Sequence, residues 1–129
     1  TFNDYTYLNY QRDETNFSGK KIPSVPQNVW VTGADLTLDN GFYTSAQLNF
    51  TDKIFLNDAN TVSADSYLLL NARAGWKGTV QNATFNFFVD GDNLLNQLYS
   101  LGNDNNAFGS RYFNPAPPRN FRIGATFGI

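Results

Sequence analysis

The chain has 129 residues, enough for one domain with a core of its own, and nine basic against eleven acidic residues give it a net charge of −2. That balance provides no basic surface for nucleic acid, so no nucleic-acid partner is expected. Cysteine and histidine are absent, which excludes disulfides, thiol chemistry and metal sites built from imidazole or thiolate ligands.

In chain order, the sequence predicts six strands and no helix. Each strand is a run of about ten residues in which apolar and polar side chains alternate, the period of a strand with unlike faces. The facing of the first strand is ambiguous, because apolar side chains such as Tyr7 and Leu8 occupy both parities. The predicted strands are 1–11, 28–38, 41–52, the two arms of a hairpin within 66–93, and 120–129.

The predicted connections are long and short in turn. Asp39, Asn40 and Gly41 carry the Asn-Gly signal of a tight two-residue hairpin with positive φ at both central residues. A second short turn joins the two arms of 66–93. Long polar connections fall at 12–27, 53–65 and 94–119. In a meander, all long loops then lie at one end of the sheet and both short turns at the other, an asymmetry typical of outer-membrane barrels.

The two parities of the predicted strands differ in chemistry. No apolar run reaches the roughly 18 residues of a membrane helix, but a membrane strand needs apolar residues only at alternate positions. On the apolar parity, a mostly aromatic row near the short turns adjoins a band of smaller side chains, as on a lipid-facing surface. The row is Leu38, Phe42, Trp76, Phe85 and Phe127. The polar parity suits a wet lumen, or equally the solvent side of a soluble sheet, so a soluble antiparallel β-sandwich or small-barrel binding module remains an alternative.

Several motifs carry a resemblance to a known family. Asp92-Asn93-Leu94-Leu95 followed by Tyr99 is similar to the DNLF..Y pattern of TonB-dependent outer-membrane receptors, the siderophore branch in particular. The stretch 111–119, RYFNPAPPR, resembles that family's RYF.PAPGR before its last strand, with Pro118 in place of the usual glycine. The motifs occur in the family's order along essentially the whole chain.

The resemblance implies that residues 1–129 form one barrel segment, an antiparallel up-and-down meander that supplies the last six strands of a barrel of about 22 strands. It implies a location in the bacterial outer membrane and uptake of an iron-siderophore or similar small ligand, with no cofactor. The implied partners are outer-membrane lipid, the remaining strands and plug of the receptor, and the iron chelate.

By the same resemblance, the three long connections would contact the ligand. Arg111 would pair with an anionic chelate, and Tyr112 would stack on it or form a hydrogen bond. The chain carries no plug and no TonB box, so TonB would act only through parts outside this chain, and active transport by the chain alone is not expected. It also ends on Gly128-Ile129, where the family usually ends on an aromatic residue.

Catalysis is not predicted. Without histidine or cysteine there is no Ser-His or Cys-His pair, and we expect no catalytic residue and no metal site. Asp90 and Asp92 share a strand face, but their position beside Gly91 and Asn93 predicts a turn in which both carboxylates are solvated.

Overall fold

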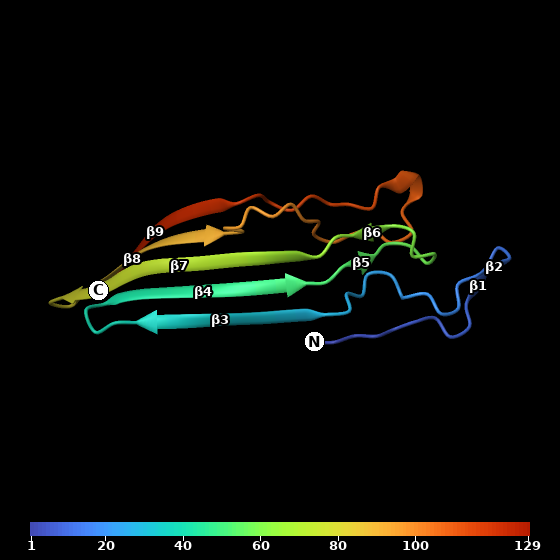
Figure 1. Cartoon of the computed structure of the whole chain (residues 1–129). Helices are drawn as coiled ribbons and strands as arrows, with labels where there is room; N and C mark the ends of the chain where they lie inside the picture. The colour runs from blue at the N-terminus through green and yellow to red at the C-terminus, as the bar shows by residue number, and fades with distance from the viewer. The chain divides into compact units, whose positions relative to one another are not determined.

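The computed structural model describes residues 1–129, and its largest element is one antiparallel five-stranded sheet. The strands follow one another in the sheet in chain order and lie side by side (Figure 1). This arrangement confirms the predicted all-β up-and-down meander. The strands are β3 (Val29–Thr37), β4 (Phe42–Thr51), β7 (Tyr67–Val80), β8 (Ala83–Asp92) and β9 (Asn120–Gly128).

Short elements lie within the connections that the sequence predicted as irregular. Two two-stranded ladders pair β1 (Gln11–Arg12) with β2 (Thr15–Asn16), and β5 (Ile54–Phe55) with β6 (Ser63–Ala64). A single 3₁₀ turn, η1, covers Phe108–Ser110. No helix in the structure has the length and apolar character needed to cross a membrane.

The strand predicted at 1–11 is wrong as a member of the sheet. Residues 1–7 run antiparallel to 19–29, but they make only isolated bridges, at Phe2 with Asn28 and Thr6 with Lys21. The partner segment contains Pro23 and Pro26, and proline has no N–H to donate to a ladder. The pairing is therefore interrupted, and the sheet has five long strands.

The turn after β3 also differs from the prediction. Leu38 N–H donates to the Phe42 carbonyl at 2.8 Å and Gly41 N–H to the Leu38 carbonyl at 3.0 Å, so three residues lie between the bonded pair Leu38 and Phe42. Only Gly41 has positive φ, at 88°. A three-residue hairpin places a left-handed residue at its third position, which explains the glycine there. The two-residue turn lies instead at Gln81 and Asn82, between the paired residues Val80 and Ala83.

The chain divides into two compact units. The loop unit comprises Thr1–Trp30, Phe50–Tyr67 and Leu98–Ala116, and the sheet unit comprises Val31–Asn49, Leu68–Gln97 and Pro117–Ile129. The buried apolar residues, Phe17, Leu56 and Ala64, all belong to the loop unit. The sheet unit buries no apolar side chain.

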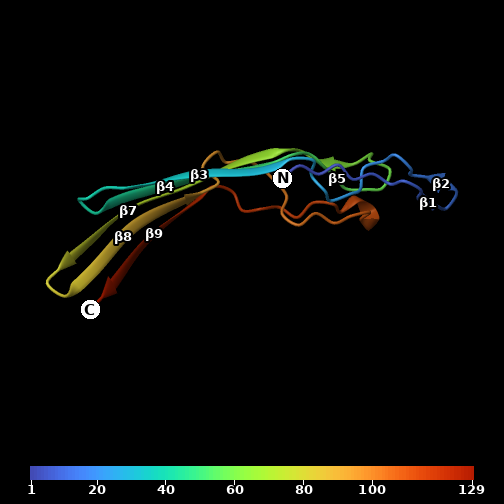
Figure 2. The same cartoon turned by 90° about the horizontal axis from the view of Figure 1, so that it is seen from below.

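The sheet unit is a single layer of strands, which Figure 2 shows from below as β8 and β9 curving away from β3 and β4. Its apolar side chains remain open: Ile123 is 88% exposed and Phe127 is 75% exposed. A sandwich would cover these side chains with a second sheet. The soluble sandwich is therefore not the architecture observed.

Candidate functional site

Strand register fixes which side chains share a face of the sheet. Pairing aligns Ala74 with Val89 and Ile123, and one step along it aligns Trp76 with Phe87 and Ala125. Between these apolar rows lies a row of the opposite face, Gly75 with Phe88 and Gly124, and beyond the Trp76 row comes the next one, Lys77 with Asn86 and Thr126. The alternation predicted from sequence thus continues across β7, β8 and β9, with Phe88 as a large apolar exception on the polar face.

The apolar face carries a connected aromatic cluster next to the short turns. The ring centroids of Trp76 and Phe85 lie 5.2 Å apart, those of Phe85 and Phe87 6.2 Å apart, and those of Phe87 and Phe127 5.8 Å apart. The indole Nε1 of Trp76 donates to the Asn40 carbonyl at 2.8 Å, so its polar edge points to the turn. An aromatic body with one hydrogen-bonded edge suits the boundary between apolar and polar surroundings.

The polar face holds an ionic cluster centred on Asp90, which is only 6% exposed. Arg73 binds it through two nitrogens, Nε and Nη2, the latter at 2.9 Å. Arg122 approaches Asp90 at 3.6 Å and Asp92 at 3.2 Å. The prediction that Asp90 is a solvated turn residue is wrong, because the register places Arg73 and Arg122 directly beside it on the neighbouring strands.

A hollow of about 410 Å³ lies over this ionic cluster. Four more polar side chains line it, from β3, β4 and β7: Asp35, Ser45, Gln47 and Asn71. The guanidinium of Arg73 also lies 4.6 Å from the ring centroid of Phe88, the one large apolar residue that the sequence puts on this parity. Paired charges thus occupy this part of the polar face.

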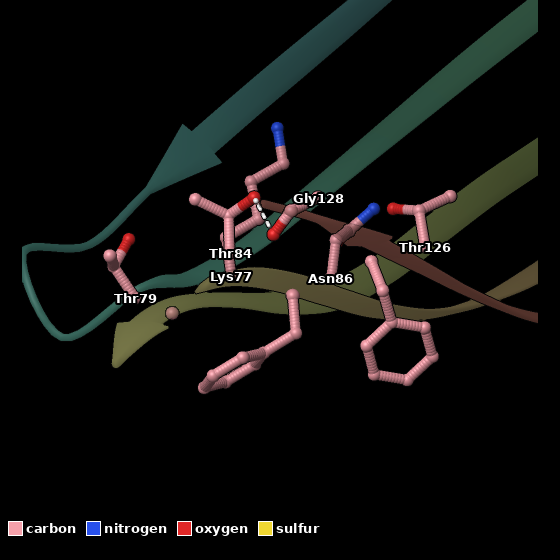
Figure 3. A pocket seen from close by; sticks show the side chains of 9 residues that line it. Lys77, Thr79, Thr84, Asn86, Thr126 and Gly128 are labelled. Carbon is pink, nitrogen blue, oxygen red and sulfur yellow. Dashed lines mark hydrogen bonds between the residues drawn. The ribbon is translucent and has the colours of Figure 1, made fainter. Parts of the chain in front are cut away.

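A second polar hollow, of about 600 Å³, lies next to the short turns. Figure 3 shows Lys77, Asn86 and Thr126 directed to one side of the strands. The Tyr43 hydroxyl donates to Asn86 Oδ1 at 2.8 Å, and the Lys77 ammonium lies 5.0 Å from the Tyr43 ring centroid. Polar side chains thus line this end of the polar face as well.

The three long connections meet in the loop unit at Asp58, which is 4% exposed. The Tyr7 hydroxyl donates to Asp58 Oδ1 at 2.8 Å, and Arg12 lies 3.2 Å from Oδ2. The Asp58 N–H donates to Asn106 Oδ1 at 3.1 Å. Burial, then the hydrogen bond to Asp58, raises the pKa of Tyr7 to about 12.

The two ligand contacts predicted from sequence lie in the third connection, just after η1. Arg111 is exposed and Tyr112 is half-buried. The Tyr112 carbonyl accepts a hydrogen bond from the Asp104 N–H at 3.0 Å, which anchors its backbone. A ligand role for these two residues stays a prediction.

No family model matches the chain. Two solved structures resemble it in fold. The ferric preacinetobactin receptor BauA of Acinetobacter baumannii matches with a TM-score of 0.70 and 22% sequence identity, over 84% of this chain and 16% of the receptor. The ferric citrate transporter FecA, in its unliganded form, matches with a TM-score of 0.71 and 20% identity, over 87% of this chain and 18% of the transporter.

The chain thus spans less than a fifth of either matched protein, and the likeness is one of fold. The resemblance read from sequence motifs is confirmed at that level. The chain is an antiparallel meander that matches part of the barrels of these two receptors.

Proposed function

We propose that residues 1–129 form one segment of the barrel of a TonB-dependent outer-membrane receptor that takes up an iron-siderophore or a similar small ligand. The observation that carries this proposal is the single-layered sheet with an open apolar face and an ion-paired polar face. Contiguous apolar surface of this kind is unfavourable in water, whereas a bilayer covers it. The polar face would then line the lumen.

The sheet's backbone fits the same proposal. Strands β3 and β9 each have a partner on one side only, and lipid cannot satisfy unpaired N–H and C=O groups. In the proposed receptor, the remaining strands of the barrel would pair with both edges. The other partners would be lipid and the plug, with TonB reached through parts outside this chain.

The proposed ligand contacts are in the loop unit. Arg111, exposed beside η1, would pair with an anionic chelate, and Tyr112 would stack on it or hydrogen-bond to it. Neither role makes or breaks a covalent bond, which agrees with the likeness to transport receptors rather than to enzymes.

Detergent dependence tests the membrane location. The chain is expected to stay folded and in solution only in detergent micelles or vesicles, because in water its exposed apolar face would drive aggregation. Monodisperse, folded protein in plain buffer would refute the proposal.

The ligand contacts need the complete receptor. There, Arg111→Ala is expected to weaken binding of ferric chelates about tenfold or more, the value of a lost charge-assisted pair. Ser110→Ala, its exposed neighbour, is the matched control and should leave binding unchanged. If the Arg111→Ala variant binds every ferric chelate tested as tightly as the natural protein does, Arg111 is not a ligand contact.

A further inference from the structure

The loop unit contains a pocket that the proposed chelate contacts do not use. Its volume is about 300 Å³, and neither Arg111 nor Tyr112 lines it. The lining residues come from the start of β7, from the residues just before it, and from the third connection: Ala64, Asp65, Tyr67, Leu98, Tyr99, Ser100, Phe113, Pro115 and Ala116. This volume lies at the lower end of the range for small-molecule sites.

The pocket's wall is held in place by backbone bonds. Ser100 and Pro115 form an antiparallel bridge. On either side of it, Ala116 N–H donates to the Tyr99 carbonyl at 3.1 Å and Leu101 N–H to the Asn114 carbonyl at 2.8 Å. The two segments of the third connection therefore hold each other in place, which fixes the backbone positions from which the lining side chains project.

Aromatic rings form the recognition surface. The Tyr67 and Tyr99 ring centroids lie 4.9 Å apart at an interplanar angle of 39°, so the two rings make one continuous aromatic surface. Leu98 and Phe113 are 92% and 52% exposed, although both line the pocket. Such surface favours a ligand with a flat apolar body.

The charge of the pocket lining indicates which ligands of this shape the pocket would bind. Asp65 is exposed and is the only charged residue in the lining, which contains no lysine or arginine. A carboxylate and tyrosine faces in the lining of one pocket attract a cation, and the carboxylate repels an anion. The electrostatics are opposite to those expected of a site for an anionic chelate.

From this combination we infer that the pocket is a binding site for a small aromatic ammonium compound. The cation would lie near Asp65 and the tyrosine faces, and the apolar body would lie against Leu98, Phe113 and Pro115. The inference concerns a site separate from Arg111 and stands whether or not the chain takes up iron chelates.

Three probes of similar size and different charge test the inference on the full chain: benzyltrimethylammonium, benzyl alcohol and benzenesulfonate. The chain is kept in a non-ionic detergent that preserves its fold, with empty micelles as the blank, and binding is followed by ligand-detected NMR titration. The expected order of affinity is cation, then neutral, then anion. Benzenesulfonate binding as tightly as the cation would overturn the inference.

Variants locate the site. Asp65→Asn, an isosteric change on an exposed side chain, is expected to lower the affinity for benzyltrimethylammonium about threefold and to leave the affinity for benzyl alcohol unchanged. Tyr99→Leu is expected to lower the affinity for benzyltrimethylammonium about fivefold or more. Phe108→Ser, on a side chain in the same connection that is 99% exposed and outside the pocket, should change neither. The inference fails if Asp65→Asn and Tyr99→Leu both bind the cation as the natural chain does, or if Phe108→Ser weakens it as much as they do.

Discussion

At the scale of single residues, buried carboxylates organise both units. Asp58 joins the three connections of the loop unit, and Asp90 joins β7, β8 and β9 on the polar face of the sheet. A buried carboxylate is tolerated only when cations and donors surround it. Asp58 therefore holds the long polar connections together, and Asp90 holds three strands together on the polar face, although neither region has many apolar contacts.

The phenol of Tyr7 provides a pH test of the Asp58 hub. Its pKa in the folded chain, about 12, lies above the ordinary value for tyrosine, about 10. The protonated phenol therefore contributes its full stability below pH about 10, and this contribution is lost as the pH rises through about 12. In an ultraviolet titration of tyrosinate, the natural chain should show a late component near pH 12 that is missing in Tyr7→Phe. A natural chain without a late component, or a late component that remains in Tyr7→Phe, would show that the hub does not form.

At the scale of elements, the turn after β3 depends on a glycine that a side chain cannot replace. Gly41 has a φ of 88°, and a Cβ there would overlap the Lys77 carbonyl oxygen. We expect Gly41→Ala to lower the free energy of unfolding by about 1–3 kcal/mol or more, from backbone strain plus this clash. Gly19→Ala is the matched control, because Gly19 has a φ of 80° with nothing within 4 Å of a Cβ.

Urea unfolding of the two variants in detergent measures this difference. Gly19→Ala should cost only the strain, about 1 kcal/mol. If both substitutions cost the same, the close approach of β7 to the turn has no energetic role.

The two faces of β9 supply a second matched pair. Ile123, 88% exposed, lies on the apolar face, and Thr126, also exposed, lies on the polar face three residues along. Ile123→Arg is expected to cost about 2–4 kcal/mol of stability in a bilayer, whereas Thr126→Arg should cost less than about 1 kcal/mol. Refolding into vesicles measures both, and equal losses would contradict the assignment of the faces.

Much of the sheet could be predicted from the sequence, because alternation is a local signal. The strands near 28–38, 41–52, 66–93 and 120–129 were expected, and the structure has them within a residue or two. The segment 1–11 failed because its apolar residues follow no single parity, and because the prolines that interrupt its pairing lie in another part of the chain. The short ladders of β1 with β2 and β5 with β6 were missed because two-residue strands carry no periodic pattern.

The candidate sites were less predictable than the sheet, because they depend on contacts between distant residues. Asp90 was expected to be solvated, since its neighbours Gly91 and Asn93 favour a turn, and only the register reveals Arg73 and Arg122 beside it. The pocket at Tyr67 and Tyr99 joins residues about thirty positions apart that no local motif connects. The family-like motif at 111–119 led to a prediction for Arg111 and Tyr112, but it did not indicate the residues that line the pocket.

At the scale of the whole molecule, the sheet is open. Its edges are β3 and β9, rather than the first predicted strand, and each has one unpaired side. β9 contains no proline, and Arg122 is its one charged residue, so little opposes the addition of another strand. We expect the isolated chain to associate through these edges.

Native mass spectrometry and hydrogen exchange in detergent test the edges. The expected result is a population of oligomers, or a monomer whose β3 and β9 amides exchange rapidly. A stable 14.5 kDa monomer with both edge strands protected would show that the sheet closes on itself.

In the proposed receptor the apolar face of the sheet would contact lipid, and tryptophan fluorescence in vesicles tests this facing. The chain has two tryptophans, so Trp30→Phe leaves Trp76, on the apolar face, as the only reporter. A second protein, carrying Trp30→Phe, Trp76→Phe and Thr126→Trp, reports from the polar face. Lipids with brominated acyl chains should quench Trp76 strongly and the reporter at position 126 weakly, and aqueous iodide should do the reverse. If iodide quenches Trp76 as strongly as it quenches the reporter at position 126, and brominated lipid does not quench Trp76, the apolar face does not contact lipid.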